Sequence, residues 1–139
     1  MRICDRDSGF AAAHIYSPVI RRLLAERIER WVYEWSDRIG ARPPDYLCLT
    51  WGGWHFMHDR KNGGCRSDPQ SNTQPLGEAC STCRGILVNI AWRMKSPAEM
   101  ENTVVHELLH LRWPLWRERT VGDRAVALML IHGRRLGSP

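Results

Sequence analysis

The chain has 139 residues, of which 43% are hydrophobic and 25% are charged. These ordinary values exclude a disordered chain and a fibrous one and indicate a single globular domain. No run approaches the roughly 18 apolar residues of a membrane span, so we expect no contact with a membrane. The first residues, MRICDRD, include acids and no apolar segment, unlike a secretory signal. We therefore expect a cytoplasmic protein.

The formal net charge is +5, and only two of the 20 basic residues are lysine, Lys61 and Lys95. Arginine suits acidic partners, so binding to nucleic acid is compatible with this charge. The arginines are spread along the whole chain, however, and do not define a binding patch. The five cysteines are an odd number, which argues against a disulfide framework in a chain without a secretion signal.

Residues 1–16 show no clear periodicity and are expected as an N-terminal arm, ahead of one domain over 17–139. Ser17 and Pro18 predict a helix start, with serine as the N-cap and proline at the first helical position. Gly40 and the prolines that follow it predict the end of this helix. Apolar residues recur every three or four positions between these signals, at Ile20, Leu24, Ile28, Trp31, Trp35 and Ile39.

Residues 46–51 and 54–58 predict two strands, and the Gly52-Gly53 pair between them predicts a hairpin or a glycine bulge. Residues 59–83 are polar and rich in glycine and proline, so they are expected as a cysteine-containing loop. Residues 85–92 are nearly all apolar and predict a strand covered on both faces.

The segment Ser96-Pro97-Ala98-Glu99 is a capping box with proline at the first helical position. It predicts a helix to about Leu111, which Pro114 lies beyond, and a last helix over 115–136. The expected fold class is therefore α+β. We expect one small domain with an N-terminal helix, a small mixed or antiparallel sheet, a helix that carries the site described next, and a C-terminal helix.

Residues 106–110 read His-Glu-Leu-Leu-His, which is the H-E-x-x-H pattern. On a helix, His106 and His110 lie one turn apart on one face, so both imidazoles can bind one zinc ion. Glu107 projects beside the metal, where it can accept a proton from a bound water molecule. The pattern thus predicts a hydrolytic zinc site.

Catalytic zinc sites usually have three protein ligands, so a third ligand is expected after the motif. In the last helix, Glu118 falls on the same side as the inward stripe of Val121, Ala125, Leu128 and Met129. Asp123 falls on the far side. His132 is also inward, but it lies about 20 Å further along a straight helix. Glu118 is therefore the preferred third ligand, and His132 is the alternative.

Cys80 and Cys83 have the C-x-x-C spacing of a zinc knuckle, and Cys65 and His58 precede them. Together the four residues predict a structural zinc site that would order the 59–83 loop. Unpaired thiols and a disulfide or redox pair are the alternatives. Cys4 and Cys48 are expected as unpaired thiols.

Four features follow one another along the chain: Trp51-Gly52, the segment with cysteines, Gly85-Ile86-Leu87-Val88-Asn89 and the H-E-L-L-H helix. Together they resemble the SprT-like and related small zincin metallopeptidases. The resemblance spans about residues 18–132. It implies a zincin-like fold, one catalytic zinc, hydrolysis of a peptide or protein substrate, His106 and His110 as ligands and Glu107 as general base. It also implies an edge strand beside the metal that holds the substrate extended, which we expect at residues 84–92.

SprT-like enzymes have a third histidine after the motif, and none occurs here before His132. The Glu118 candidate is more similar to the minigluzincins, whose latent forms cover the cleft with their own chain. The leading hypothesis is therefore a zinc metallopeptidase, either active or latent. The alternative is a non-catalytic, zinc-bearing module that binds nucleic acid.

Overall fold

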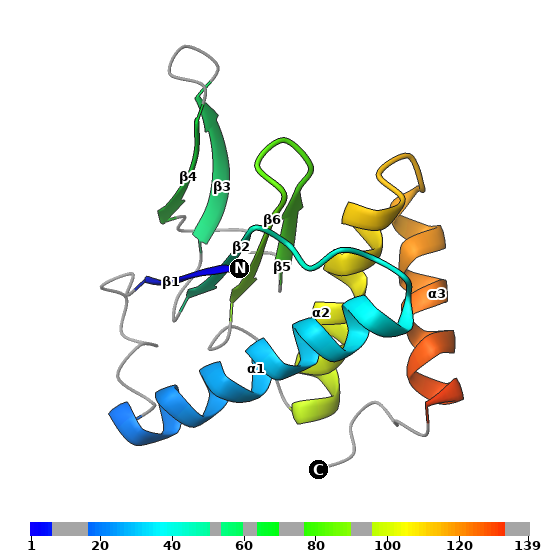
Figure 1. Ribbon diagram of the computed structural model, residues 1–139, viewed down its shortest axis with the longest axis horizontal. Helices are drawn as coiled ribbons and strands as arrows, with labels where there is room; N and C mark the ends of the chain where they lie inside the picture. Colours follow the sequence, from blue (N-terminus) through cyan, green and yellow to red (C-terminus); the bar gives the residue numbers. More distant parts are fainter. Residues whose placement is uncertain (7–16, 51–53, 60–63, 70–76, 90–95, 133–139) are drawn as a thin grey trace.

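The computed structural model describes residues 1–6, 17–50, 54–59, 64–69, 77–89 and 96–132, with the backbone alone for 4–6, 50, 54–59, 64–69 and 89. The fold is α+β, as the sequence predicts (Figure 1). Its helices are α1 (Pro18–Arg38), α2 (Pro97–Arg112) and α3 (Glu118–Ile131). Its strands are β1 (Arg2–Arg6), β2 (Tyr46–Thr50), β3 (Trp54–Asp59), β4 (Gly64–Pro69), β5 (Gly77–Cys80) and β6 (Gly85–Asn89).

The main sheet is mixed and has the order β1-β2-β6-β5. β1, β2 and β6 run parallel, whereas β5 runs antiparallel to β6. β3 and β4 pair with each other as a separate antiparallel hairpin. β5 is therefore an edge strand of the main sheet, and β6 is an inner strand with a partner on each side.

The signals at the ends of α1 act as predicted. The side chain of Ser17 accepts a hydrogen bond from the backbone N–H of Ile20, and Pro18 is the first helical residue. Gly40 follows the helix with a φ of +68°, a left-handed conformation that glycine adopts without a steric cost. Trp35 and Ile28 lie on the buried face of the helix.

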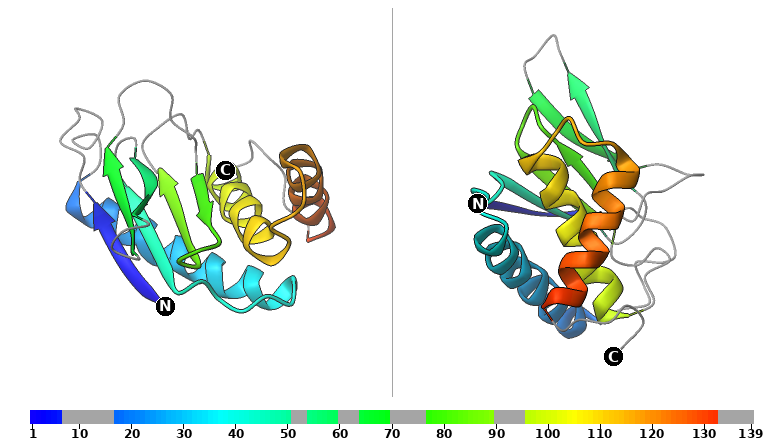
Figure 2. Two further views of the ribbon diagram at one scale, coloured as in Figure 1. Left: turned by 90° about the horizontal axis from the view of Figure 1, so that it is seen from above. Right: turned by 90° about the vertical axis from the view of Figure 1, so that its right-hand side faces the viewer.

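One core lies between the sheet and the helices, and Figure 2 shows α1 and α2 beside the sheet with α3 next to α2. Alternate residues of β2 and β6 point into it, because successive side chains of a strand face opposite sides. The buried residues of this core include Leu47, Leu49, Ile86, Val88, Ile28, Trp35, Val104, Val105, Leu108, Val121, Ala125 and Met129. Cys48 and Leu87 belong to a smaller cluster on the opposite face of the sheet.

Four expectations about the local structure are wrong. The strand that begins at Trp54 pairs with β4, and the described residues show no pairing of it with β2, so the hairpin of these two strands is not formed. The alternative, a glycine bulge at Gly52-Gly53, lies outside the described residues. The 59–83 segment contains β4 and β5, and the 1–16 arm contains β1, because strand partners order short polar segments that have no apolar periodicity of their own. The last helix is also shorter than expected: α3 begins at Glu118, and His132 is its C-cap.

No helix in the described parts of the chain combines the length and the apolar character that crossing a membrane requires.

Candidate metal centre

α2 places the H-E-x-x-H residues. The side chain of Ser96 accepts a hydrogen bond of 3.2 Å from the backbone N–H of Glu99, which fixes the start of the helix. Val104, Val105 and Leu108 lie in the core, so the opposite side of the helix presents the two partly buried histidines. The helix thus holds His106 and His110 one turn apart on a rigid, well-packed element.

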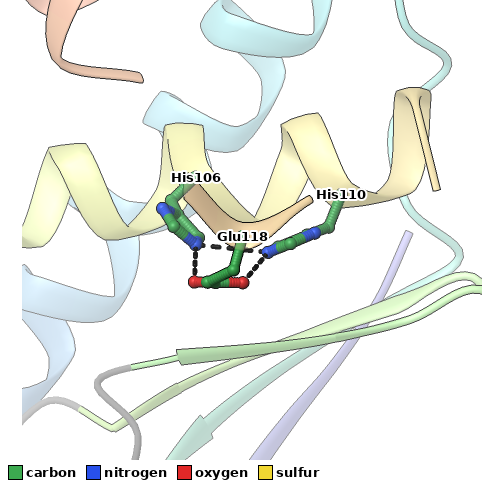
Figure 3. A group of neighbouring side chains, drawn as sticks. All are labelled: His106, His110 and Glu118. Carbon is green, nitrogen blue, oxygen red and sulfur yellow. Dashed lines mark hydrogen bonds and ion pairs between the residues drawn. The ribbon is translucent and has the colours of Figure 1, made fainter. Parts of the chain in front are cut away.

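Glu118 reaches both histidines from the first turn of α3 (Figure 3). Its Oε1 lies 2.6 Å from Nε2 of His106, and its Oε2 lies 2.7 Å from Nε2 of His110. The turn between α2 and α3 directs it there: the rings of Trp113 and Trp116 stack at 4.4 Å, and the N–H of Trp116 donates to the carbonyl of Trp113. A short turn therefore brings an acid back over the histidine pair.

The three side chains fit a tetrahedral metal site. Ligand atoms at about 2.0–2.1 Å from a zinc ion lie about 3.3 Å from one another. The Nε2 atoms of His106 and His110 are 3.2 Å apart, close to that value. The Glu118 oxygens lie closer, so this side chain must withdraw by about 0.7 Å to admit a zinc ion. Solvent leaves room for this shift, since 75% of the Glu118 side chain is exposed.

Only part of the argument for Glu118 from the sequence is correct. Val121, Ala125 and Met129 are buried on α3, so the direction of the inward stripe is right. Glu118 continues that stripe toward His106 but stands at the exposed start of the helix. It is held there by the histidines and not by burial in the core.

The electrostatics of these groups follow from burial and proximity. Burial lowers the pKa of His106, against the attraction of the Glu118 carboxylate. Burial acts to raise the pKa of Glu118, but the attraction and hydrogen bonds of His106 and His110 outweigh it and lower that pKa. Glu107 is only 6% exposed, and burial, followed by the charges of Glu118 and Glu78, raises its pKa well above the ordinary value.

A cleft of about 460 Å³ opens at this group. On one side it is lined by Glu107, His110 and Glu118, and on the other by residues 77–79 of β5. The edge strand beside the centre is thus β5, and the expectation that residues 84–92 supply it is wrong. β6 cannot take that role, because β2 and β5 occupy both of its backbone edges.

Two residues of β5 were missed by the sequence argument. Gly77 packs against α2, and a Cβ atom there would lie 2.7 Å from Cγ2 of Thr103 and 3.0 Å from Cγ of Glu107. Glu78 lines the cleft and contributes to the raised pKa of Glu107. Both residues stand in a polar segment without apolar alternation, so only the strand pairing reveals their position.

The other candidates lie elsewhere. His132, the alternative third ligand, packs its ring edge-on against Trp35 at a centroid distance of 5.0 Å and is not part of the His106 group. Cys80 and Cys83 lie at the turn between β5 and β6. His58 and Cys65 occupy opposite positions of the β3–β4 pair, but their side chains lie outside the described part of the structure.

Comparison of the chain with protein-family models, with curated proteins and with solved structures finds no match.

Proposed function

We propose that the protein is a zinc-dependent metallopeptidase. The observation that carries the proposal is the convergence of His106, His110 and Glu118 on one point, with Glu107 lining the same cleft. Two imidazoles and a carboxylate are a ligand set that zinc uses in hydrolytic enzymes. A bound zinc ion supplies a Lewis acid that polarises the scissile carbonyl and lowers the pKa of a water molecule.

Proton transfer and the alignment of the substrate are assigned to residues of the chain. Glu107 takes a proton from the attacking water as the new carbon–oxygen bond forms, and delivers it to the amine nitrogen as the carbon–nitrogen bond breaks. β5 offers the backbone of an edge strand beside the cleft, to which an extended peptide can add by main-chain hydrogen bonds. Such pairing would align a peptide bond with Glu107.

The test is hydrolysis of an unfolded protein substrate by the zinc-loaded chain. Glu107→Gln should retain zinc and lose hydrolysis, because the amide keeps the shape of the side chain but cannot accept the proton. Glu118→Gln should lose the zinc ion of the His106 centre together with activity, whereas Asp123→Asn, the same change at an exposed position of α3, should lose neither. A Glu107→Gln protein with full activity, or a wild-type protein that binds no zinc at His106 and His110, contradicts the proposal.

The alternative, a non-catalytic, zinc-bearing module that binds nucleic acid through Cys80, Cys83 and the arginines, stays a prediction from the sequence. Its signature would be salt-dependent binding of DNA or RNA that survives His106→Ala.

A further inference from the structure

The face of the main sheet opposite the helices carries a small cluster of its own. It consists of Cys48 from β2, Leu87 from β6 and Cys80 from β5, with Cys83 packed against it. Cys80 is 2% exposed and closes β5, and Cys83 follows in the turn to β6. Two sulfur-bearing side chains with the spacing of a metal knuckle therefore lie together at one end of the sheet.

A backbone N–H group of this turn points to the sulfur atom of Cys80. The N–H of Cys83 donates a hydrogen bond of 3.4 Å to Sγ of Cys80. An N–H group aimed at sulfur offsets the negative charge of a thiolate, which is the form that binds metal. The turn thus provides a donor for the atom that would carry the charge.

Arg84 reverses the chain after the second cysteine in a left-handed conformation, with a φ of +56°. This conformation is costly for a residue other than glycine and persists only where its surroundings hold it. Here Nη2 of Arg84 donates to the carbonyls of Arg42 and Pro43, at 3.1 Å each. The carbonyl of Arg84 in turn accepts from the N–H of Asp45. The turn is therefore fixed before any ligand binds.

β3 of the β3–β4 hairpin contacts both β5 and β6, the two strands that the Cys80–Cys83 turn connects (Figure 1). His58 and Cys65 are directly opposite each other in the hairpin register, and opposite positions of an antiparallel pair share one face. The hairpin thus carries a second pair of metal-ligating residue types at one position of its register.

We propose that Cys80 and Cys83 bind a structural zinc ion with His58 and Cys65, which joins the β3–β4 hairpin to the main sheet. Among the described strands the hairpin pairs with none of that sheet, so a metal can add a connection between them. Because Cys80 ends the strand that begins at Gly77, the ion also holds β5 against α2. This site is separate from the His106 centre and does not depend on peptidase activity.

Cobalt substitution under reducing conditions tests this site, because thiolate ligands give a sulfur-to-cobalt charge-transfer band that histidine and carboxylate ligands do not. The wild-type protein should bind about two equivalents of metal and show the band. Cys80→Ser and Cys83→Ser should each lose about one equivalent together with most of the band. Cys65→Ser should weaken the band, and His58→Ala should lower the affinity without removing all of it. The matched control is Cys48→Ser, a cysteine of the same cluster outside the proposed ligand set.

The His106→Ala/His110→Ala variant separates the two sites, since it should lose about one equivalent and keep the whole charge-transfer band. Two further measurements guard against misfolding of the serine variants. Cys80→His should keep the metal, and in the wild-type protein a chelator should make the thiols of Cys65, Cys80 and Cys83 reactive. A reduced wild-type protein without the band, a band unchanged in folded Cys80→Ser, or unchanged affinity in both Cys65→Ser and His58→Ala overturns the proposal.

Discussion

Gly77 of β5 lies so close to Glu107 of α2 that a Cβ atom on the glycine would stand 3.0 Å from Cγ of the glutamate. The same Cβ atom would also meet the carbonyl oxygen of Leu87 at 3.0 Å. The side chains of Thr103 and Glu107 and the backbone of Leu87 therefore occupy the space that a methyl group at position 77 would need. The absence of a side chain at position 77 therefore sets the distance between the edge strand and the helix that carries the histidines.

Gly77→Ala should destabilise the fold by about 1–3 kcal/mol, the usual cost of inserting a methyl group into a packed site. It should also move β5 away from α2 and so reduce hydrolysis more than zinc binding. Urea unfolding, a zinc titration and the peptidase assay measure the three effects.

Gly122→Ala is the matched control, because the new Cβ atom would lie 3.9 Å from Cε1 of His106, an ordinary contact distance. In the interior of α3, alanine should stabilise the helix by about 0.5–1 kcal/mol. If Gly77→Ala is as stable and as active as Gly122→Ala, neither the stability of the fold nor hydrolysis depends on the close approach of β5 to α2.

The sequence predicts α1 and α2 well, because their signals are local. Ser17 and Ser96 cap α1 and α2 as expected, and the H-E-x-x-H spacing alone brings His106 and His110 together. Glu118 is also found from the sequence, since it continues the face of α3 that Val121 and Ala125 bury.

The strands near the centre are not predictable in this way, because their structure depends on partners distant in the chain. β5 contains Gly77 and Glu78, neither of which favours a strand, and it forms only by pairing with β6. The resemblance to zincins implies an edge strand at the metal and points to β6, but the apolar residues of β6 reflect burial between two neighbouring strands. A buried inner strand is easy to recognise, whereas the edge strand that lines the cleft is not.

Trp35 and Glu101 link α1 to α2 inside the protein. Nε1 of Trp35 donates a hydrogen bond of 2.6 Å to Oε2 of Glu101, whose residue is 3% exposed. Trp35→Phe removes this donor and should cost about 1–3 kcal/mol of unfolding free energy, since a buried acceptor loses a partner. Thermal unfolding measures the loss. Unchanged thermal stability of Trp35→Phe would contradict a stabilising role for this hydrogen bond.

Zinc should stabilise the folded protein through Glu118. At a free zinc concentration about 100 times the dissociation constant, binding adds about 2.7 kcal/mol to the unfolding free energy. If Glu118→Gln weakens binding about 100-fold, the gain at the same concentration falls to about 0.4 kcal/mol. Asp123→Asn should keep the full gain. Because Cys80 and Cys83 are proposed to bind a separate ion, the comparison is made in the Cys80→Ser background, and equal gains in both α3 variants would exclude Glu118 as a ligand.

Glu107→Gln should make the metal-free protein more stable than the wild-type protein, by an amount that grows as the pH rises. Burial, with Glu118 and Glu78, raises the pKa of Glu107 in the folded state. The folded protein therefore binds this proton more tightly than the unfolded chain does, and its stability falls as the pH rises through the window between the two pKa values. Glutamine has no proton to lose, so the advantage of the variant should be absent at the acidic end of that window and grow toward neutral pH.

The measurement is urea unfolding of both proteins in a chelator, from about pH 4 to about pH 8. Glu26→Gln, the same change at an exposed position of α1, is the control and should show no such growing advantage. Saturating zinc should shrink the advantage of Glu107→Gln, because the nearby cation favours the ionised carboxylate of the wild-type protein. An advantage that is constant across the pH range, or that is largest in acid, would show that Glu107 is not a buried carboxyl group with a raised pKa.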